Sequence, residues 1–138
     1  MLKLNKIKYS DLNARQKENH NFHKVAAELA NYGFNSIWLN DDWMGADFIA
    51  YNGDGTTIKI QLKGRLTIDK KYFGAEKNIY VTFCQAGKWY LYPHDEVCEY
   101  ILSLGRINST LSWDERGGYS WKSIPPWLIT YMQSFCLD

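Results

Sequence analysis

The hexapeptide Ile58-Lys59-Ile60-Gln61-Leu62-Lys63 decides how this chain folds. Successive side chains of a β-strand point to opposite faces of a sheet. The alternation therefore predicts a strand with an apolar face, made by the two isoleucines and the leucine, and a polar face that carries Gln61 and Lys63. The apolar face is expected to pack into a core, which leaves the polar face for chemistry.

An aspartate lies upstream of this strand, in Gly45-Ala46-Asp47-Phe48-Ile49-Ala50. A second strand is expected from about Asp47 to Tyr51. The intervening Asn52-Gly53-Asp54-Gly55 predicts a hairpin, because Asn-Gly and Asp-Gly supply the positive φ angles of tight turns. A hairpin this short pairs the two strands side by side, so Asp47 is predicted to lie near Gln61 and Lys63.

This grouping predicts a site for a divalent cation. Mg²⁺ takes oxygen ligands, typically one or two carboxylates together with water and substrate phosphate oxygens. Asp47 is the best candidate ligand, and Gln61 would add a neutral carbonyl oxygen, which binds more weakly than a carboxylate. Lys63 could hold a water molecule or the scissile phosphate and stabilise the charge that develops in an in-line displacement.

A helix is expected upstream, capped by Asp11 or Asn13 and running to about Asn31. Its apolar stripe has the spacing i, i+3, i+4, i+7, in Phe22, Val25, Ala26 and Leu29.

Two glutamates of this helix differ in direction. At 100° per residue from Phe22, Glu18 lies at about −40°, inside the apolar arc, and Glu28 at about −120°, outside it. Glu18 is therefore a further candidate metal ligand at the edge of the sheet. The alternative is a solvated first-turn acid that the helix dipole favours.

The remaining elements follow from alternation and turn residues. We expect a strand at Phe34 to Leu39, a turn at Asn40-Asp41-Asp42, strands at Ile79 to Cys84 and Lys88 to Tyr92, a helix from Pro93 to Gly105, and an irregular tail with a short helix at about Trp127 to Phe135. At 138 residues the chain is predicted to form one domain, 1–138, with a core at about 13–104 and an aromatic-rich extension at 105–138.

Positive charge is concentrated after the motif strand. The segment from Lys59 to Lys77 has a balance of +4, although the whole chain has a net charge of only +1. Arg65, Lys70, Lys71 and Tyr72 are expected to contact phosphates that flank a cut. The alternative is a solvated, lysine-rich turn.

Other classes of protein find less support. Three widely spaced cysteines without a C-x-x-C pair argue against a disulfide framework and a structural zinc site. No apolar run has the roughly 20 residues of a membrane helix, and no secretory signal precedes the domain, so we expect a cytoplasmic protein. His20 and His23 are interpreted as surface histidines, not as a metal pair.

The pattern of Asp47, Gln61 and Lys63, with Glu18 on the preceding helix, resembles the PD-(D/E)XK nuclease superfamily. The resemblance spans roughly 13–84 and is closest to the branch of Holliday-junction resolvases and Mrr-like restriction nucleases. It implies an α/β fold with a restriction-endonuclease-like αβββαβ core, in which helices flank a mixed central sheet. It also implies hydrolysis of phosphodiester bonds with Mg²⁺ or Mn²⁺. Two departures are the missing proline before Asp47 and the glutamine at 61, which Mrr-like members also contain.

The leading hypothesis is a metal-dependent endonuclease that acts on DNA, in restriction or defence, or in repair and recombination. Such a small domain would recognise DNA by shape, bind it without sequence preference, or gain reach as a homodimer. The alternative is a nuclease-like module that binds nucleic acid or a protein without cutting, since Gln61 removes one negative ligand. A third hypothesis makes the aromatic-rich second half a protein-interaction surface.

Overall fold

The computed structural model describes all residues, Met1–Asp138. Helix α1 (Ala14–Ala30) begins where the sequence predicted a cap. The Asn13 side chain accepts a hydrogen bond from the Gln16 N–H, and the Gln16 side chain accepts one from the Asn13 N–H, both at 2.9 Å. This reciprocal pair is a capping box, which satisfies two N–H groups that the helix leaves unpaired. Asp11 lies instead in a short 3₁₀ helix, η1 (Tyr9–Asp11).

Three antiparallel strands follow the helix: β1 (Asn35–Trp43), β2 (Ala46–Tyr51) and β3 (Thr57–Leu62). The predicted hairpin between β2 and β3 is confirmed, with Phe48 opposite Ile60. The predicted turn at Asn40-Asp41-Asp42 is wrong, because these residues continue β1. The chain turns instead at Met44-Gly45, where both residues have positive φ angles.

The main sheet is mixed, as predicted. Its six strands have the order β1-β2-β3-β5-β6-β8, with β5 (Ile79–Gln85), β6 (Lys88–Pro93) and β8 (Cys136–Leu137). Only β3 and β5 are parallel. The crossover between them differs from the αβββαβ pattern, because it holds the short strand β4 (Thr67–Asp69) and the 3₁₀ helix η2 (Lys70–Tyr72) in place of an α-helix.

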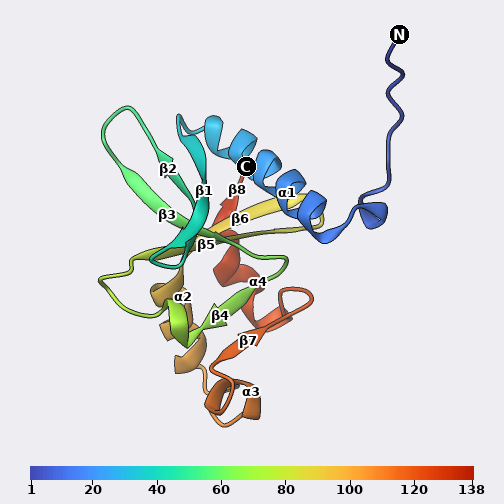
Figure 1. Cartoon of the computed structure of the whole chain (residues 1–138). Coiled ribbons are helices and arrows are strands. Elements are labelled where there is room, and N and C mark those ends of the chain that lie inside the picture. Colours follow the sequence, from blue (N-terminus) through green and yellow to red (C-terminus); the bar gives the residue numbers. More distant parts are fainter.

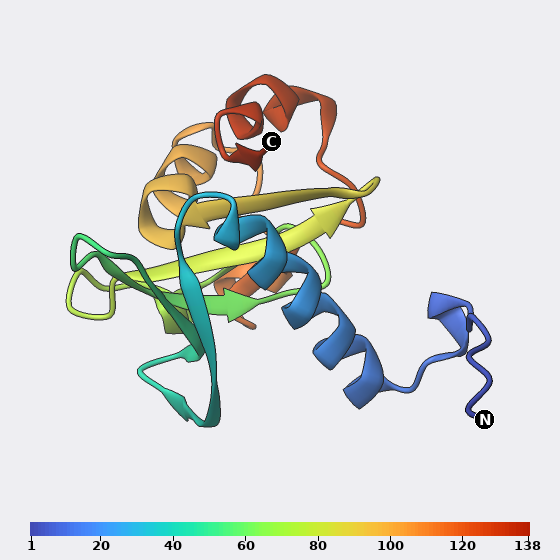
Figure 2. The same cartoon turned by 90° about the horizontal axis from the view of Figure 1, so that it is seen from above.

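Helices cover both faces of this sheet (Figures 1 and 2). Helix α1 packs on one face, where Phe22, Val25 and Leu29 meet Phe48 and Ile60. Helices α2 (His94–Ser103) and α4 (Pro126–Gln133) lie on the other face. The larger hydrophobic cluster is on that side and includes Val81, Phe83, Tyr92, Ile101 and Leu128.

The C-terminal segment is more regular than expected. Helix α3 (Leu111–Asp114) precedes β7 (Gly118–Ser120), which pairs with β4 in a separate two-stranded sheet, and β8 extends the main sheet. Trp113 and Met132 are buried in the same cluster as α2. Strands of two or three residues show no alternation, so only their distant partners define them.

The first eight residues extend away from the domain (Figure 1), and all of them are exposed. The longest helix is α1, with 17 residues, and none of the helices is long and apolar enough to cross a membrane.

A buried histidine fastens the crossover to α2. His94 is fully buried, and its Nε2 accepts the Asp69 N–H at 3.0 Å, while its Nδ1–H donates to Asp95 Oδ1 at 3.0 Å. The second oxygen of Asp95 accepts the Gly74 N–H at 3.1 Å. Burial is the main cause that lowers the pKa of His94, so the ring is neutral in the fold. The pair therefore fixes both ends of η2.

Replacing His94 by alanine is expected to cost about 2–4 kcal/mol of unfolding free energy at pH 7.5, because it leaves a cavity and an unpaired Asp69 N–H. The folded pKa of His94 lies below its ordinary value of 6.5. The histidine's contribution is therefore present above pH 6.5 and decreases as the pH falls below it. Urea unfolding should show a smaller difference from wild type at pH 5. The exposed His23→Ala serves as control, and a penalty that grows toward pH 5 would contradict this account.

Candidate metal and DNA site

Strand pairing brings Asp47 opposite Gln61. The register pairs Phe48 with Ile60, and the next step along the two antiparallel strands sets Asp47 against Gln61 on the same face of the sheet. One carboxylate oxygen of Asp47, Oδ2, accepts the Leu62 N–H at 2.8 Å. The backbone of β3 therefore fixes the carboxylate, and its other oxygen has no hydrogen-bond partner in the protein.

The environment of Asp47 disfavours its charge. The pKa of Asp47 is raised to about 6; burial is the largest cause, and the charges of Asp42 and Glu18 act in the same direction. The hydrogen bond from Leu62 and the charge of Lys63 lower the pKa but do not compensate. Asp47 takes part in neither of the two ion pairs of the structure. A half-buried carboxylate among other acids is the kind of group that a cation would stabilise.

Lys63 follows the last residue of β3, and its side chain lies on the same face of the sheet as that of Gln61. Its N–H donates to the Thr82 carbonyl at 2.9 Å, which extends the parallel pairing with β5 by one residue. The Nζ atom lies 5.3 Å from the centre of the Tyr72 ring, and the Nζ of Lys71 lies 5.1 Å from the same ring. One aromatic side chain therefore contacts both ammonium groups. Of the two, only that of Lys63 affects the pKa of Asp47, whereas Lys71 Nζ lies 3.9 Å from Asp69 Oδ2.

Two further acids lie near Asp47. Glu18 is exposed, although its helical angle placed it in the apolar arc, because the buried stripe of α1 begins only at Phe22. Its charge still contributes to the raised pKa of Asp47. Asp42, which the sequence assigned to a turn, has a larger effect on that pKa. An extension of the first strand to Trp43 would have found Asp42, since β1 continues to that residue.

The candidate metal ligands are oxygen atoms, which suit a hard cation, and there are few of them. No three His, Cys, Asp or Glu side chains are grouped closely enough to hold a metal ion. Asp47 and Gln61 would supply one carboxylate and one amide oxygen, both of the type that Mg²⁺ and Mn²⁺ accept. The residues fit an open site in which water and a substrate oxygen would provide the other ligands, and Glu18 and Asp42 add negative charge nearby.

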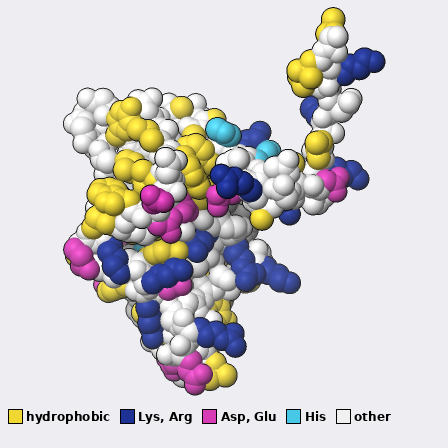
Figure 3. Space-filling model, in the orientation of Figure 1, with side chains coloured by type: hydrophobic (Ala, Val, Ile, Leu, Met, Phe, Trp, Pro, Cys, Tyr) yellow, Lys and Arg dark blue, Asp and Glu magenta, His cyan; other side chains and the backbone are white.

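The predicted DNA-binding residues lie in the crossover after β3: Arg65 precedes β4, and Lys70, Lys71 and Tyr72 form η2. Arg65, Lys70 and Lys71 are exposed, whereas Tyr72 retains only 4% of its exposed area. Tyr72 therefore supports Lys63 and Lys71 and has little surface for DNA. The Nζ of Lys70 lies 5.1 Å from the ring centre of Trp113. Figure 3 shows Lys and Arg side chains over the lower half of this face, below a group of Asp and Glu side chains.

Comparisons with known proteins concern the fold. No protein-family model matches the chain, and no curated protein is significantly similar to it. Among solved structures, the chain is similar to Hjc, a Holliday junction resolvase of the archaeal hyperthermophile Archaeoglobus fulgidus. The identity is 21%, the TM-score is 0.40, and the match covers 51% of this chain and 74% of the resolvase.

Proposed function

We propose that this chain is a metal-dependent endonuclease that hydrolyses phosphodiester bonds in DNA. The observation that carries the proposal is the pairing of Asp47 with Gln61, beside Lys63, on one face of the sheet. The carboxylate is half-buried, oriented by a backbone N–H and without a cationic partner, as a metal ligand should be. Exposed lysines on the adjacent crossover match a polyanionic substrate.

The side chains divide the chemistry between them. Asp47 and Gln61, with Glu18 nearby, would hold Mg²⁺ or Mn²⁺. When bound, the cation would activate a water molecule and neutralise charge on the scissile phosphate. Lys63 would donate from Nζ to a phosphate oxygen and stabilise the charge that develops there. Arg65, Lys70 and Lys71 would bind flanking phosphates, which fixes the register of the DNA without reading its sequence.

Cleavage assays test this proposal. Purified protein is incubated with supercoiled plasmid, linear duplex and four-way-junction DNA, in Mg²⁺, in Mn²⁺ and in EDTA. Metal-dependent cutting supports the proposal, and the preferred substrate separates a junction-directed role in repair or recombination from a general role in defence. Binding of all three substrates without cutting would overturn it.

The second candidate is a nuclease-like module that binds DNA without cutting. The observation in its favour is Gln61, which leaves Asp47 as the only carboxylate of the facing pair. Fewer negative ligands weaken the hold on a hard cation.

The variant Gln61→Glu is expected to lower the Mn²⁺ concentration for half-maximal thermal stabilisation by roughly 10-fold or more, because it adds a negative ligand opposite Asp47. The matched control is Thr57→Glu, which adds the same charge to an exposed position on the same face of β3. Equal shifts in both variants would indicate a general charge effect and would contradict a ligand role for position 61.

A further inference from the structure

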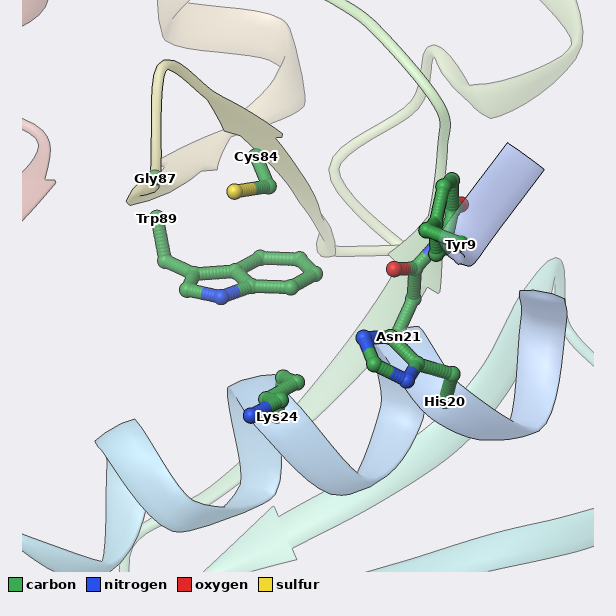
Figure 4. Close-up of a pocket in the computed structure, with 7 residues that line it drawn as sticks. All are labelled: Tyr9, His20, Asn21, Lys24, Cys84, Gly87 and Trp89. Carbon is green, nitrogen blue, oxygen red and sulfur yellow. The ribbon is translucent and has the colours of Figure 1, made fainter. Parts of the chain in front are cut away.

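A pocket of about 420 Å³ lies between α1, the turn that joins β5 to β6, and the start of the chain (Figure 4). It is separate from the Asp47 site and lies on the α1 side of the sheet. Two aromatic side chains, a cysteine, a glycine and three polar side chains of α1 line it: Tyr9, Trp89, Cys84, Gly87, His20, Asn21 and Lys24.

Tyr9 closes the outer side of this pocket. Its hydroxyl oxygen accepts a hydrogen bond from Asn21 Nδ2 at 2.9 Å, and its ring lies 5.2 Å from that of His20. The Nζ of Lys17 lies 5.5 Å from the centre of the same ring. Because all the residues before Tyr9 are exposed, these contacts hold the start of the chain against α1. The ring itself is still 45% exposed and can contact a ligand.

The lining combines flat apolar walls with polar groups. Trp89, only 7% exposed, forms the inner wall opposite Tyr9. Figure 4 shows the three side chains along α1, with Asn21 and His20 near Tyr9 and Lys24 on the side of Trp89. The Asn21 side-chain oxygen has no partner in the protein and can accept a hydrogen bond, and Lys24 brings a positive charge. Flat walls, edge hydrogen-bonding groups and a cation suit a nucleotide, with its planar base and its phosphate.

The pocket and the Asp47 side chain lie on opposite faces of the sheet, because Phe48, the neighbour of Asp47, packs against α1. Both lie toward the same end of the parallel strands β3 and β5, since Cys84 is near the end of β5 and Lys63 follows β3. Thr82, whose carbonyl accepts the Lys63 N–H, precedes Cys84 of the pocket by two residues on β5. Two residues of a strand span about 7 Å. On α1, Lys17 contacts Tyr9 and its neighbour Glu18 lies toward Asp47. A DNA strand that crosses Lys63 could therefore place a nearby nucleotide in the pocket.

We propose that this pocket binds one unpaired nucleobase of the DNA that the Asp47 site cuts. The inference rests on the proposed function and specifies its substrate class. A base inside an intact duplex is stacked on both sides and must be extruded before it enters a pocket. The protein therefore prefers DNA with an unpaired nucleotide, such as an overhang, a flap or a bulge, to a continuous duplex.

Equilibrium binding in EDTA tests the pocket without cleavage. The probes are a fluorescent blunt duplex, the same duplex with a short thymidine overhang, and that overhang with abasic sites. Wild type is expected to bind the thymidine overhang about 5–100-fold more tightly than the blunt duplex, as stacking of one base would give. The abasic overhang should lose this preference. The ratio should change little with salt, because stacking releases no counterions.

Substitutions at Tyr9 test whether the preference for the thymidine overhang arises in this pocket. Tyr9→Ala should abolish the preference, whereas Tyr9→Phe, which retains the ring and loses the bond from Asn21, should keep most of it. An equal affinity of wild type for all probes, or an intact preference in Tyr9→Ala, would overturn the proposal. If the protein cuts DNA with metal but binds all three probes with equal affinity, the nuclease proposal stands and the pocket proposal fails. If it binds no DNA at all, both proposals fail.

Discussion

Replacing Asp47 by asparagine is expected to make the protein more stable at neutral pH and inactive as a nuclease. The introduced asparagine can still accept the Leu62 N–H through its side-chain oxygen, but it carries no charge into the half-buried position. The loss of charge removes the unfavourable interactions with Asp42 and Glu18. The same loss removes the carboxylate that would hold the metal. Stability and activity should therefore change in opposite directions.

The expected gain in stability follows from the pKa of Asp47, which rises from an ordinary 3.8 to about 6 in the folded protein. The folded state binds this proton more tightly than the unfolded state, so protonation stabilises the fold. That contribution is present at low pH and is lost as the pH rises through about 6. The shift corresponds to at most about 3 kcal/mol, and partial exposure reduces this to about 1–2 kcal/mol.

Urea unfolding at pH 7.5 and at pH 5 measures this effect. Asp47→Asn should exceed wild type by about 1–2 kcal/mol at pH 7.5 and by less at pH 5, where wild-type Asp47 is largely protonated. Asp42→Asn is the matched control, and because Asp42 is exposed its effect should stay within about 0.5 kcal/mol. Added Mn²⁺ should stabilise wild type and not Asp47→Asn. Equal stability of Asp47→Asn and wild type at pH 7.5 would contradict the burial of a charged carboxylate.

Lys63→Met is expected to reduce the single-turnover cleavage rate by about 10²–10³-fold, which is the usual loss when one group that stabilises developing charge is removed. Methionine keeps an apolar stem beside Tyr72, so the fold should be retained. DNA binding should weaken only slightly, because one phosphate contact among several is lost.

Lys71→Met is the matched control, since both lysines lie over the same Tyr72 ring. It should weaken DNA binding and lower the salt dependence of binding by about one phosphate contact, while the cleavage rate of bound DNA stays close to wild type. Similar losses in cleavage rate for Lys63→Met and Lys71→Met would show that Lys63 acts only as a general DNA contact.

Local signals predicted the centre of the site. The alternation around Gln61 and the Asn-Gly and Asp-Gly turn residues specify a two-stranded hairpin, and a hairpin fixes which residues face each other. The position of Asp47 beside Gln61 could therefore be predicted from the sequence alone. The helix cap at Asn13 is equally local, since both partners lie within one turn.

The features that the sequence did not predict depend on contacts between residues far apart in the chain. Strands β4 and β7 pair across roughly fifty residues and are each too short to show a period. Tyr72 is buried because α2, through His94, holds η2 against the domain. Glu18 has the helical angle of a core residue, but the buried part of α1 begins one turn later, at Phe22. A helical angle gives a direction and does not say whether a neighbour is there.

The most direct test is plasmid cleavage by wild type and Asp47→Asn at equal concentration in Mn²⁺, after unfolding experiments have shown that both are folded. The account predicts nicked and linear products with wild type, none in EDTA, and none with Asp47→Asn although it is the more stable protein. Cleavage by Asp47→Asn at the wild-type rate would show that the Asp47 site is not where DNA is cut.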